Sequence, residues 1–357
     1  MGFDDIFTGK AQKLWWQRLD DDRIIDGSPP VPFEKDGAYY VIRLKEMFLR
    51  SSRRLWRKLS PVLHAFVRHG AVEENSVAGP GQLKELGEAR LDRVVHLNQR
   101  LAGPRPFTGE DLQMVVGLFS VPGGDATRAL IDTVSTLAGL GGFALGSAAQ
   151  IATVVKTGVE QIVGLDSALL QLGVRDTFYP GNPLRPGYHL GVAARIEPDD
   201  LAKLWLVKGR LVSGDDPIAA RPYEAHDYFV IEIERRTRRD DWAGLRGIAE
   251  LNQQFATVMA DASDAAGKRT RLAQLWPAFT QALRSSTELT APDRAAIAAD
   301  VQHDLRARLD VANPFELRDL TGRPRPAGFD FIDVPATVDP DDPADAARGR
   351  AALDGPL

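Results

Sequence analysis

Stretches rich in β-branched and aromatic residues recur through the first two thirds of the chain, most of them bounded by Gly, Pro or Asn. Such stretches are typical of strands in a partly buried sheet. The regular alternation of strands and helices that a doubly wound sheet requires is missing. We therefore expect an α+β fold built on an antiparallel, β-sandwich-like sheet. The expected strands cover residues 38–44, 62–67, 94–101, 112–121, 188–196, 204–207, 210–212 and 228–234.

Helical periodicity interrupts this pattern once and then replaces it. Apolar residues at helical spacing predict an inserted helical hairpin at about residues 125–163, with glycines at its turn. From Trp242 onward three apolar stripes predict three helices. Pro277 falls inside the second stripe, where a proline is expected to kink the helix or to begin a new one. Thr290 is the expected N-cap of the third helix.

These patterns divide the chain into three parts. A β-rich domain with an N-terminal helix and the inserted hairpin is expected over residues 1–237, and a helical segment over residues 238–311. Residues 312–357 are rich in Pro and Asp, which predicts an irregular tail. Within it, residues 329–334 could form a strand that adds to a partner's sheet edge or docks on the chain's own domain.

Composition excludes several classes of chemistry. The 357 residues contain no Cys, so disulfides, thiolate catalysis and Cys-ligated zinc are ruled out. The formal net charge of −5 gives no global attraction to nucleic acid or anionic lipid, so such a partner would need a local basic patch. The N-terminal residues lack the apolar core of a secretory signal, and we expect a cytoplasmic protein. Heavy use of Ala, Arg, Asp and Gly is typical of a high-GC bacterial genome.

A local basic patch is present shortly after the first expected strand. Its basic residues recur at the i, i+3, i+4, i+7, i+8 spacing that would place them on one face of a helix, with Trp56 and Leu residues opposite. Such a helix could lie at an anionic membrane surface or contact phosphate backbones, or could simply cover the sheet with its apolar face. The candidate binding residues are Arg50, Arg53, Arg54, Trp56, Arg57 and Lys58.

Residues 133–155 form a second candidate segment, because they comprise 23 residues without a formal charge. That length could span a bilayer, although the many Gly, Ala and polar residues make the segment only weakly apolar. A packed hairpin of the protein core is the simpler interpretation. A hairpin released on activation is the alternative.

Catalytic patterns are sparse. The six histidines include no pair at metal-ligand spacing, and nucleotide-binding and nucleophile motifs are missing, so we expect no metal and no cofactor. An acidic cluster around Asp227 and Glu232 could hold a divalent cation for hydrolysis. Salt bridges on an exposed sheet face are the plainer interpretation of the same residues.

The sequence thus favours a non-enzymatic binding or assembly protein, with a protein partner or self-assembly expected and an anionic membrane or nucleic acid as the partner of the basic segment. The alternatives are a metal-dependent hydrolase or nuclease around Asp227 and Glu232, and a regulated membrane-active effector that uses residues 133–155.

Overall fold

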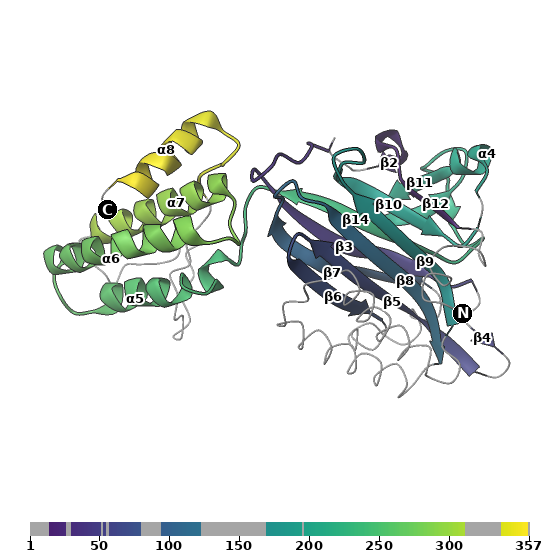
Figure 1. The fold of residues 1–357 in the computed structure, drawn as a ribbon, viewed down its shortest axis with the longest axis horizontal. Coiled ribbons are helices and arrows are strands. Elements are labelled where there is room, and N and C mark those ends of the chain that lie inside the picture. The colour runs from purple at the N-terminus through teal and green to yellow at the C-terminus, as the bar shows by residue number, and fades with distance from the viewer. Residues whose placement is uncertain are drawn as a thin grey trace. The chain divides into compact units, whose positions relative to one another are not determined.

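The computed structural model describes residues 14–25, 30–50, 53–54, 57–79, 94–122, 169–194, 196–310 and 337–355. Contacts divide the chain into two compact units. The β unit comprises residues 1–33, 40–103 and 109–235, and the helical unit comprises residues 34–39, 104–108 and 236–357. Both units are drawn in Figure 1.

The described strands of the β unit form three sheets, in agreement with the expected α+β class and its antiparallel sheets. The strands are β1 (Trp15–Arg18), β2 (Ile24–Ile25), β3 (Tyr39–Phe48), β4 (Arg53–Arg54), β5 (Arg57–His69), β6 (Val72–Ala78), β7 (Val94–Pro106), β8 (Leu112–Pro122), β9 (Leu169–Phe178), β10 (Gly187–Val192), β11 (Leu204–Val207), β12 (Arg210–Ser213), β13 (Arg221–Pro222) and β14 (Tyr228–Arg236). A 3₁₀ turn (Asp21–Arg23) and a short helix α4 (Pro198–Leu201) lie between them.

Two large sheets pack face to face. One has the strand order β1-β10-β14-β3-β7, and the other has the order β4-β5-β8-β9 with β6 also paired to β5. Aromatic side chains interlock between the sheets: the Phe178 ring lies 5.9 Å from the His189 ring, and Tyr40 meets His69 edge-on at 5.1 Å. Because successive residues of a strand point to opposite faces, this contact uses one face of each sheet.

A small sheet of order β13-β12-β11-β2 covers part of the outer face of the first large sheet. Leu204, Leu206 and Leu211 form one buried cluster with Phe48, Leu190, Val192, Tyr228 and Val230. Residues 228–231 of β14 are consequently buried on both faces. Farther along the same strand, beyond Val230, Glu232 and Glu234 are only partly buried and pair with Lys45 at 3.1 Å and Arg43 at 2.8 Å.

Side-chain hydrogen bonds join neighbouring edges of the two large sheets. On one side Trp16 Nε1 of β1 donates to Asp176 Oδ2 of β9 at 2.8 Å. On the other side Gln99 Nε2 of β7 donates to the Val77 carbonyl of β6 at 3.0 Å, and Gly103 N donates to Glu74 Oε2 at 3.1 Å. The sandwich is therefore joined along both sides by side chains.

The helical unit contains α5 (Ala249–Ala260), α6 (Ala265–Ser285), α7 (Ala291–Asp310) and α8 (Pro343–Asp354), preceded by a 3₁₀ turn at Trp242–Gly244. Phe255, Trp276 and Phe279 meet in the centre of its core, with ring centroids 5.1 to 6.4 Å apart. The predicted cap of α7 is present, because Asp293 N donates to Thr290 Oγ1 at 3.3 Å. Pro277 lies inside α6, which continues through it and does not begin anew there.

One sequence prediction is wrong, and three others cannot be judged in full on the described residues. The tail is not irregular throughout, since residues 343–354 form α8. The predicted N-terminal helix had no stated bounds: residues 14–25 form β1, a 3₁₀ turn and β2, and residues 1–13 lie outside the described residues. The inserted hairpin at 125–163 and the tail strand at 329–334 lie outside the described residues. The predicted domain boundaries at residues 237 and 311 are not tested by the structure and stay predictions.

Candidate anion-binding hairpin

The basic segment is a β-hairpin and not the predicted helix. Arg53 pairs with Lys58 and Arg54 with Arg57 in antiparallel register, joining β4 to the start of β5. The prediction failed because the spacing of the basic residues fits a helix, whereas β5 forms eleven consecutive pairs with β8 from Leu59↔Pro122 to His69↔Leu112. This long ladder favours extended backbone at the start of β5 over the local helical periodicity.

The hairpin register pairs basic residues with basic residues. Directly opposed residues of an antiparallel pair have Cβ atoms about 4.5–5.5 Å apart, and like charges at such positions are destabilising. Arg53 opposite Lys58, and Arg54 opposite Arg57, are two such pairs in succession. The residues between Arg54 and Arg57 are Leu55 and Trp56, where a two-residue hairpin connection usually has Asn, Asp or Gly.

The base of the basic segment is fixed to the sandwich. Phe48, the last residue of β3, stacks on Tyr228 with ring centroids 5.4 Å apart. Two residues later the exposed Arg50 donates its backbone N–H to Asp227 Oδ1 at 2.6 Å. Asp227 is itself held at the start of β14, because its carbonyl accepts from Ala193 N at 2.9 Å. These contacts fix the point at which the basic segment leaves the sandwich.

The structure does not bring Asp227 and Glu232 together. Asp227 directly precedes β14 and Glu232 lies within it, five residues further along, which is a distance of about 16 Å in an extended chain. An odd separation also places the two side chains on opposite faces of the sheet. Asp227 binds the Arg50 backbone, whereas Glu232 pairs with Lys45. Among the described residues no group of three or more His, Asp or Glu side chains is placed to hold a metal ion.

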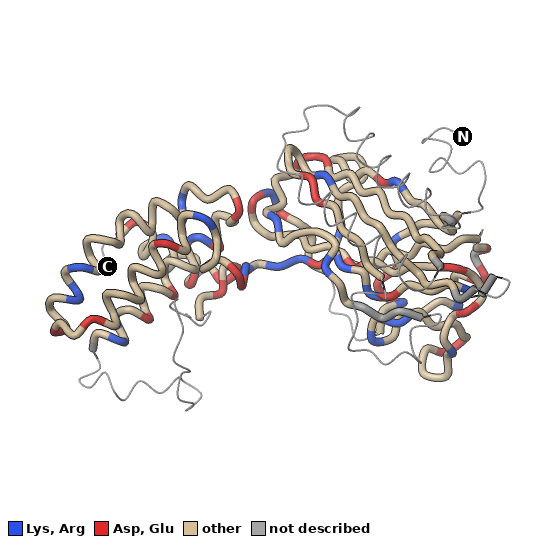
Figure 2. The backbone as a smooth tube through the Cα atoms, turned by 90° about the horizontal axis from the view of Figure 1, so that it is seen from below, with Lys and Arg blue, Asp and Glu red and all other residues tan. Residues whose placement is uncertain are grey.

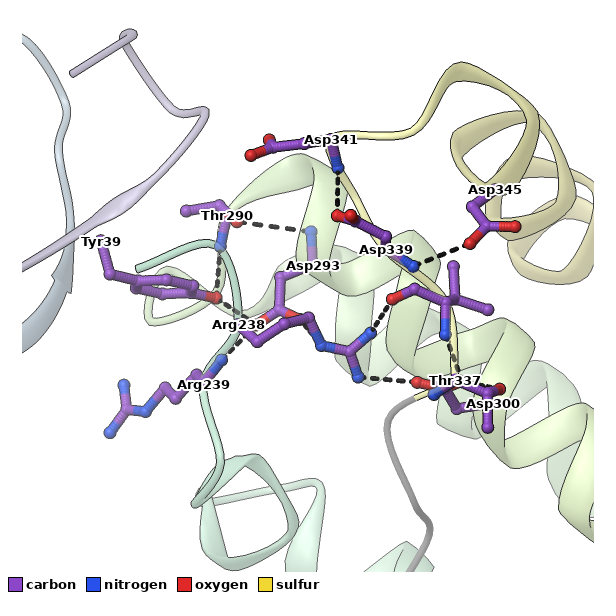
Figure 3. Close-up of polar contacts among 11 residues, drawn as sticks. Tyr39, Arg238, Arg239, Thr290, Asp293, Asp300, Thr337, Asp339, Asp341 and Asp345 are labelled. Atoms are coloured by element: carbon purple, nitrogen blue, oxygen red, sulfur yellow. Dashed lines mark hydrogen bonds and ion pairs between the residues drawn. The ribbon is translucent and has the colours of Figure 1, made fainter. Parts of the chain in front are cut away.

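A buried polar cluster in the helical unit was not predicted from the sequence, and Figure 3 shows its contacts. Asp293 is fully buried; its Oδ2 accepts from Tyr39 OH at 2.7 Å and from Arg239 N at 3.0 Å, and its Oδ1 pairs with Arg238 Nε at 3.0 Å. Burial raises the pKa of Asp293 to about 6, although the nearby Arg238 cation and the bond from Tyr39 favour its charged form.

Arg238 extends the cluster to the C-terminal segment. Its Nη2 pairs with Asp300 Oδ2 at 2.7 Å, and its Nη1 donates to the Val338 carbonyl at 2.9 Å. Asp300 Oδ1 accepts from Thr337 N at 2.9 Å, from Thr337 Oγ1 at 2.7 Å and from Val338 N at 3.1 Å. Asp293 and Asp300 are seven residues apart, so the sequence placed two acids on one face of the predicted helix, a signal that could have revealed the cluster.

Acidic and basic residues are interspersed over the described parts of both units, with basic residues followed by acids where β14 leads into the helical unit (Figure 2). Among the helices formed by the described residues, none is long and apolar enough to cross a membrane.

No protein-family model matches the chain, and no curated protein is significantly similar to it in sequence.

Proposed function

We propose that this protein is a non-enzymatic binding protein that attaches to an anionic membrane surface through the β4–β5 hairpin. The observation that carries the proposal is the register, in which two pairs of basic residues oppose each other across the hairpin. An arrangement of like charges costs free energy in the isolated protein, and anionic headgroups between the charges would relieve it.

The residues between the paired cations favour lipid over nucleic acid as the partner. Trp is enriched at the level of the lipid headgroups, and Leu gains free energy when it is transferred to the acyl region. Leu55 and Trp56 lie in sequence between Arg54 and Arg57, so apolar and cationic residues occur together in one hairpin. Each basic residue near an anionic membrane contributes about 1 kcal/mol, which is enough for several residues together to offset a negative net charge.

The proposal is tested by vesicle sedimentation. The wild-type protein should sediment with phosphatidylserine-containing vesicles at low salt, should stay in solution with phosphatidylcholine vesicles, and should be released as salt rises. The triple variant Arg53→Glu, Arg54→Glu, Arg57→Glu should lose this binding. The control is Arg185→Glu, Lys203→Glu, Arg221→Glu, which makes the same change in net charge at exposed positions of the β unit and should leave binding nearly intact.

Two results would contradict the proposal. Equal loss of binding in both triple variants would show that only the net charge matters. Binding to single- or double-stranded DNA that matches or exceeds vesicle binding at the same salt would assign the hairpin to nucleic acid. Thermal unfolding of each variant shows whether the β unit remains folded.

A further inference from the structure

The start of the C-terminal segment is attached to the helical unit through backbone and polar groups and through one buried side chain. At Thr337 and Val338 the two N–H groups, the hydroxyl and one carbonyl all bind Asp300 or Arg238, while the Val338 side chain is 4 % exposed. Recognition of main-chain groups combined with burial of a side chain is one way in which proteins bind peptides.

The groups that hold this segment are positioned without it. The Arg238 guanidinium pairs through Nε with the fully buried Asp293, which is itself held by Tyr39 and Arg239. Both aspartates are on α7, whose N-terminus is capped by Thr290. Because these contacts lie within residues 39 and 238–300, the binding groups should stay in place when residues 337–338 leave (Figure 3).

Helix α8 adds a close backbone approach to α7 and two polar contacts near its C-terminal end. Its buried residues are Gly349 and Ala352, and a Cβ atom on Gly349 would come within 2.8 Å of the Ala295 backbone on α7. Trp276 Nε1 donates to the Gly355 carbonyl at 3.1 Å, and Arg284 pairs with Asp354 at 2.9 Å. The buried residues of α8 are small, so they bury little apolar area of their own.

We propose that α7 and residues 238–239 form a peptide-binding site that the chain's own C-terminal segment occupies. The site takes a protein segment in which Thr or Ser precedes a branched apolar residue and an Asp-capped helix of small residues follows. Residues 311–336 connect α7 to the occupant within one chain, so the occupant competes intramolecularly with any outside ligand. The tethered copy therefore keeps outside ligands away until it is cut or displaced.

The experiment uses the full chain with a specific protease site introduced within residues 311–336, and a fluorescent peptide of residues 335–357 as the probe. Before cleavage the peptide should bind weakly or not at all. Cleavage turns the intramolecular competitor into one that is present only at the micromolar protein concentration, so the apparent affinity of the peptide should rise on the order of 100-fold. Failure of the peptide to bind the cut protein while circular dichroism shows intact helices overturns the proposal.

Variants of the peptide test the contacts without altering the protein. Thr337→Val removes the hydroxyl that donates to the Asp300 carboxylate and should weaken binding about 10-fold, since hydrogen bonds to charged groups are the stronger ones. Gly349→Leu should abolish binding because of the approach to Ala295. Ala351→Leu introduces the same side chain at an exposed position and should bind like the wild-type peptide. Equal affinities for all of these peptides would contradict the proposed site.

The same substitutions in the uncut chain show whether the segment is a ligand or an integral part of the bundle. In Gly349→Leu the amides of α8 should lose hydrogen-exchange protection, whereas α5, α6 and α7 keep theirs, and Ala351→Leu should change neither. Loss of protection in all four helices of Gly349→Leu would show that α8 is required for the fold, and would overturn the proposal.

Discussion

Two buried histidines of the β unit should make its stability depend on pH. His64 is buried in β5, and desolvation lowers its pKa to about 4, partly offset by a hydrogen bond with Asn75. His189 is 5 % exposed under the Trp16 ring, and desolvation together with the nearby Arg18 lowers its pKa to about 3. Histidine in an unfolded chain has a pKa near 6.5, so the unfolded state takes up protons first as the pH falls.

We predict that His189→Phe removes part of this dependence. Between pH 7 and pH 5 each buried histidine should cost about 2 kcal/mol of unfolding free energy, because it stays neutral in the fold while it is protonated in the unfolded chain. Phe keeps a ring beside Trp16 and has no titrating group. Urea unfolding at the two pH values measures the effect, and His303→Gln at an exposed position is the control. An unchanged pH slope in His189→Phe would contradict the assignment.

Side-chain hydrogen bonds between residues that are far apart in the chain are largely hidden from the sequence. The N-cap Thr290 could be predicted because its partner is three residues away. The bond between Tyr39 and Asp293 joins residues separated by 254 positions, and Asp300 meets Thr337 across 37. Nothing in local periodicity encodes such pairs, because tertiary packing decides which buried acid meets which donor.

Among secondary-structure elements, predictability followed the strength of the local pattern. Strands with β-branched and aromatic runs, such as β3, β8 and β14, were predicted. The hairpin β4–β5 was mistaken for a helix because its charges happen to recur at helical spacing. Helix α8 was missed because it has few apolar residues, and its position depends on the close approach of Gly349 to Ala295.

The bond between β1 and β9 should contribute measurably to the sandwich. We expect Trp16→Phe and Asp176→Ala each to lower the unfolding free energy, and the double variant to lose less than the sum by about 1.5 kcal/mol, since the indole donates to a carboxylate. A double-mutant cycle in urea measures this coupling. Strictly additive effects would show that the two sheet edges are held by apolar packing alone.

For the whole molecule, the two units should respond to acid in opposite directions. An acid whose pKa is raised in the fold stabilises the folded state as the pH falls through that value, so Asp293 should add about 1 kcal/mol to the helical unit between pH 7 and pH 5. In the β unit His64 and His189 reduce stability over the same range, and the buried Glu46, whose pKa burial raises, offsets part of this loss.

Scanning calorimetry at pH 7 and pH 5 checks this prediction. The transition of the β unit should move to lower temperature at pH 5, while that of the helical unit stays or rises. Asp293→Asn should remove the rise. If the wild-type protein and Asp293→Asn each show a single transition, and the two transitions shift in the same way with pH, the units unfold together and Asp293 has no separate effect.

The opposed cations of β4 and β5 give salt two contrary effects on one hairpin. Mobile ions screen the repulsion between Arg53 and Lys58 and between Arg54 and Arg57, so the strands should pair more firmly at high ionic strength. The same ions weaken attraction to headgroups. At low ionic strength anionic headgroups would take the place of the salt ions, so the hairpin should be stabilised by the membrane under the conditions in which salt stabilises it least.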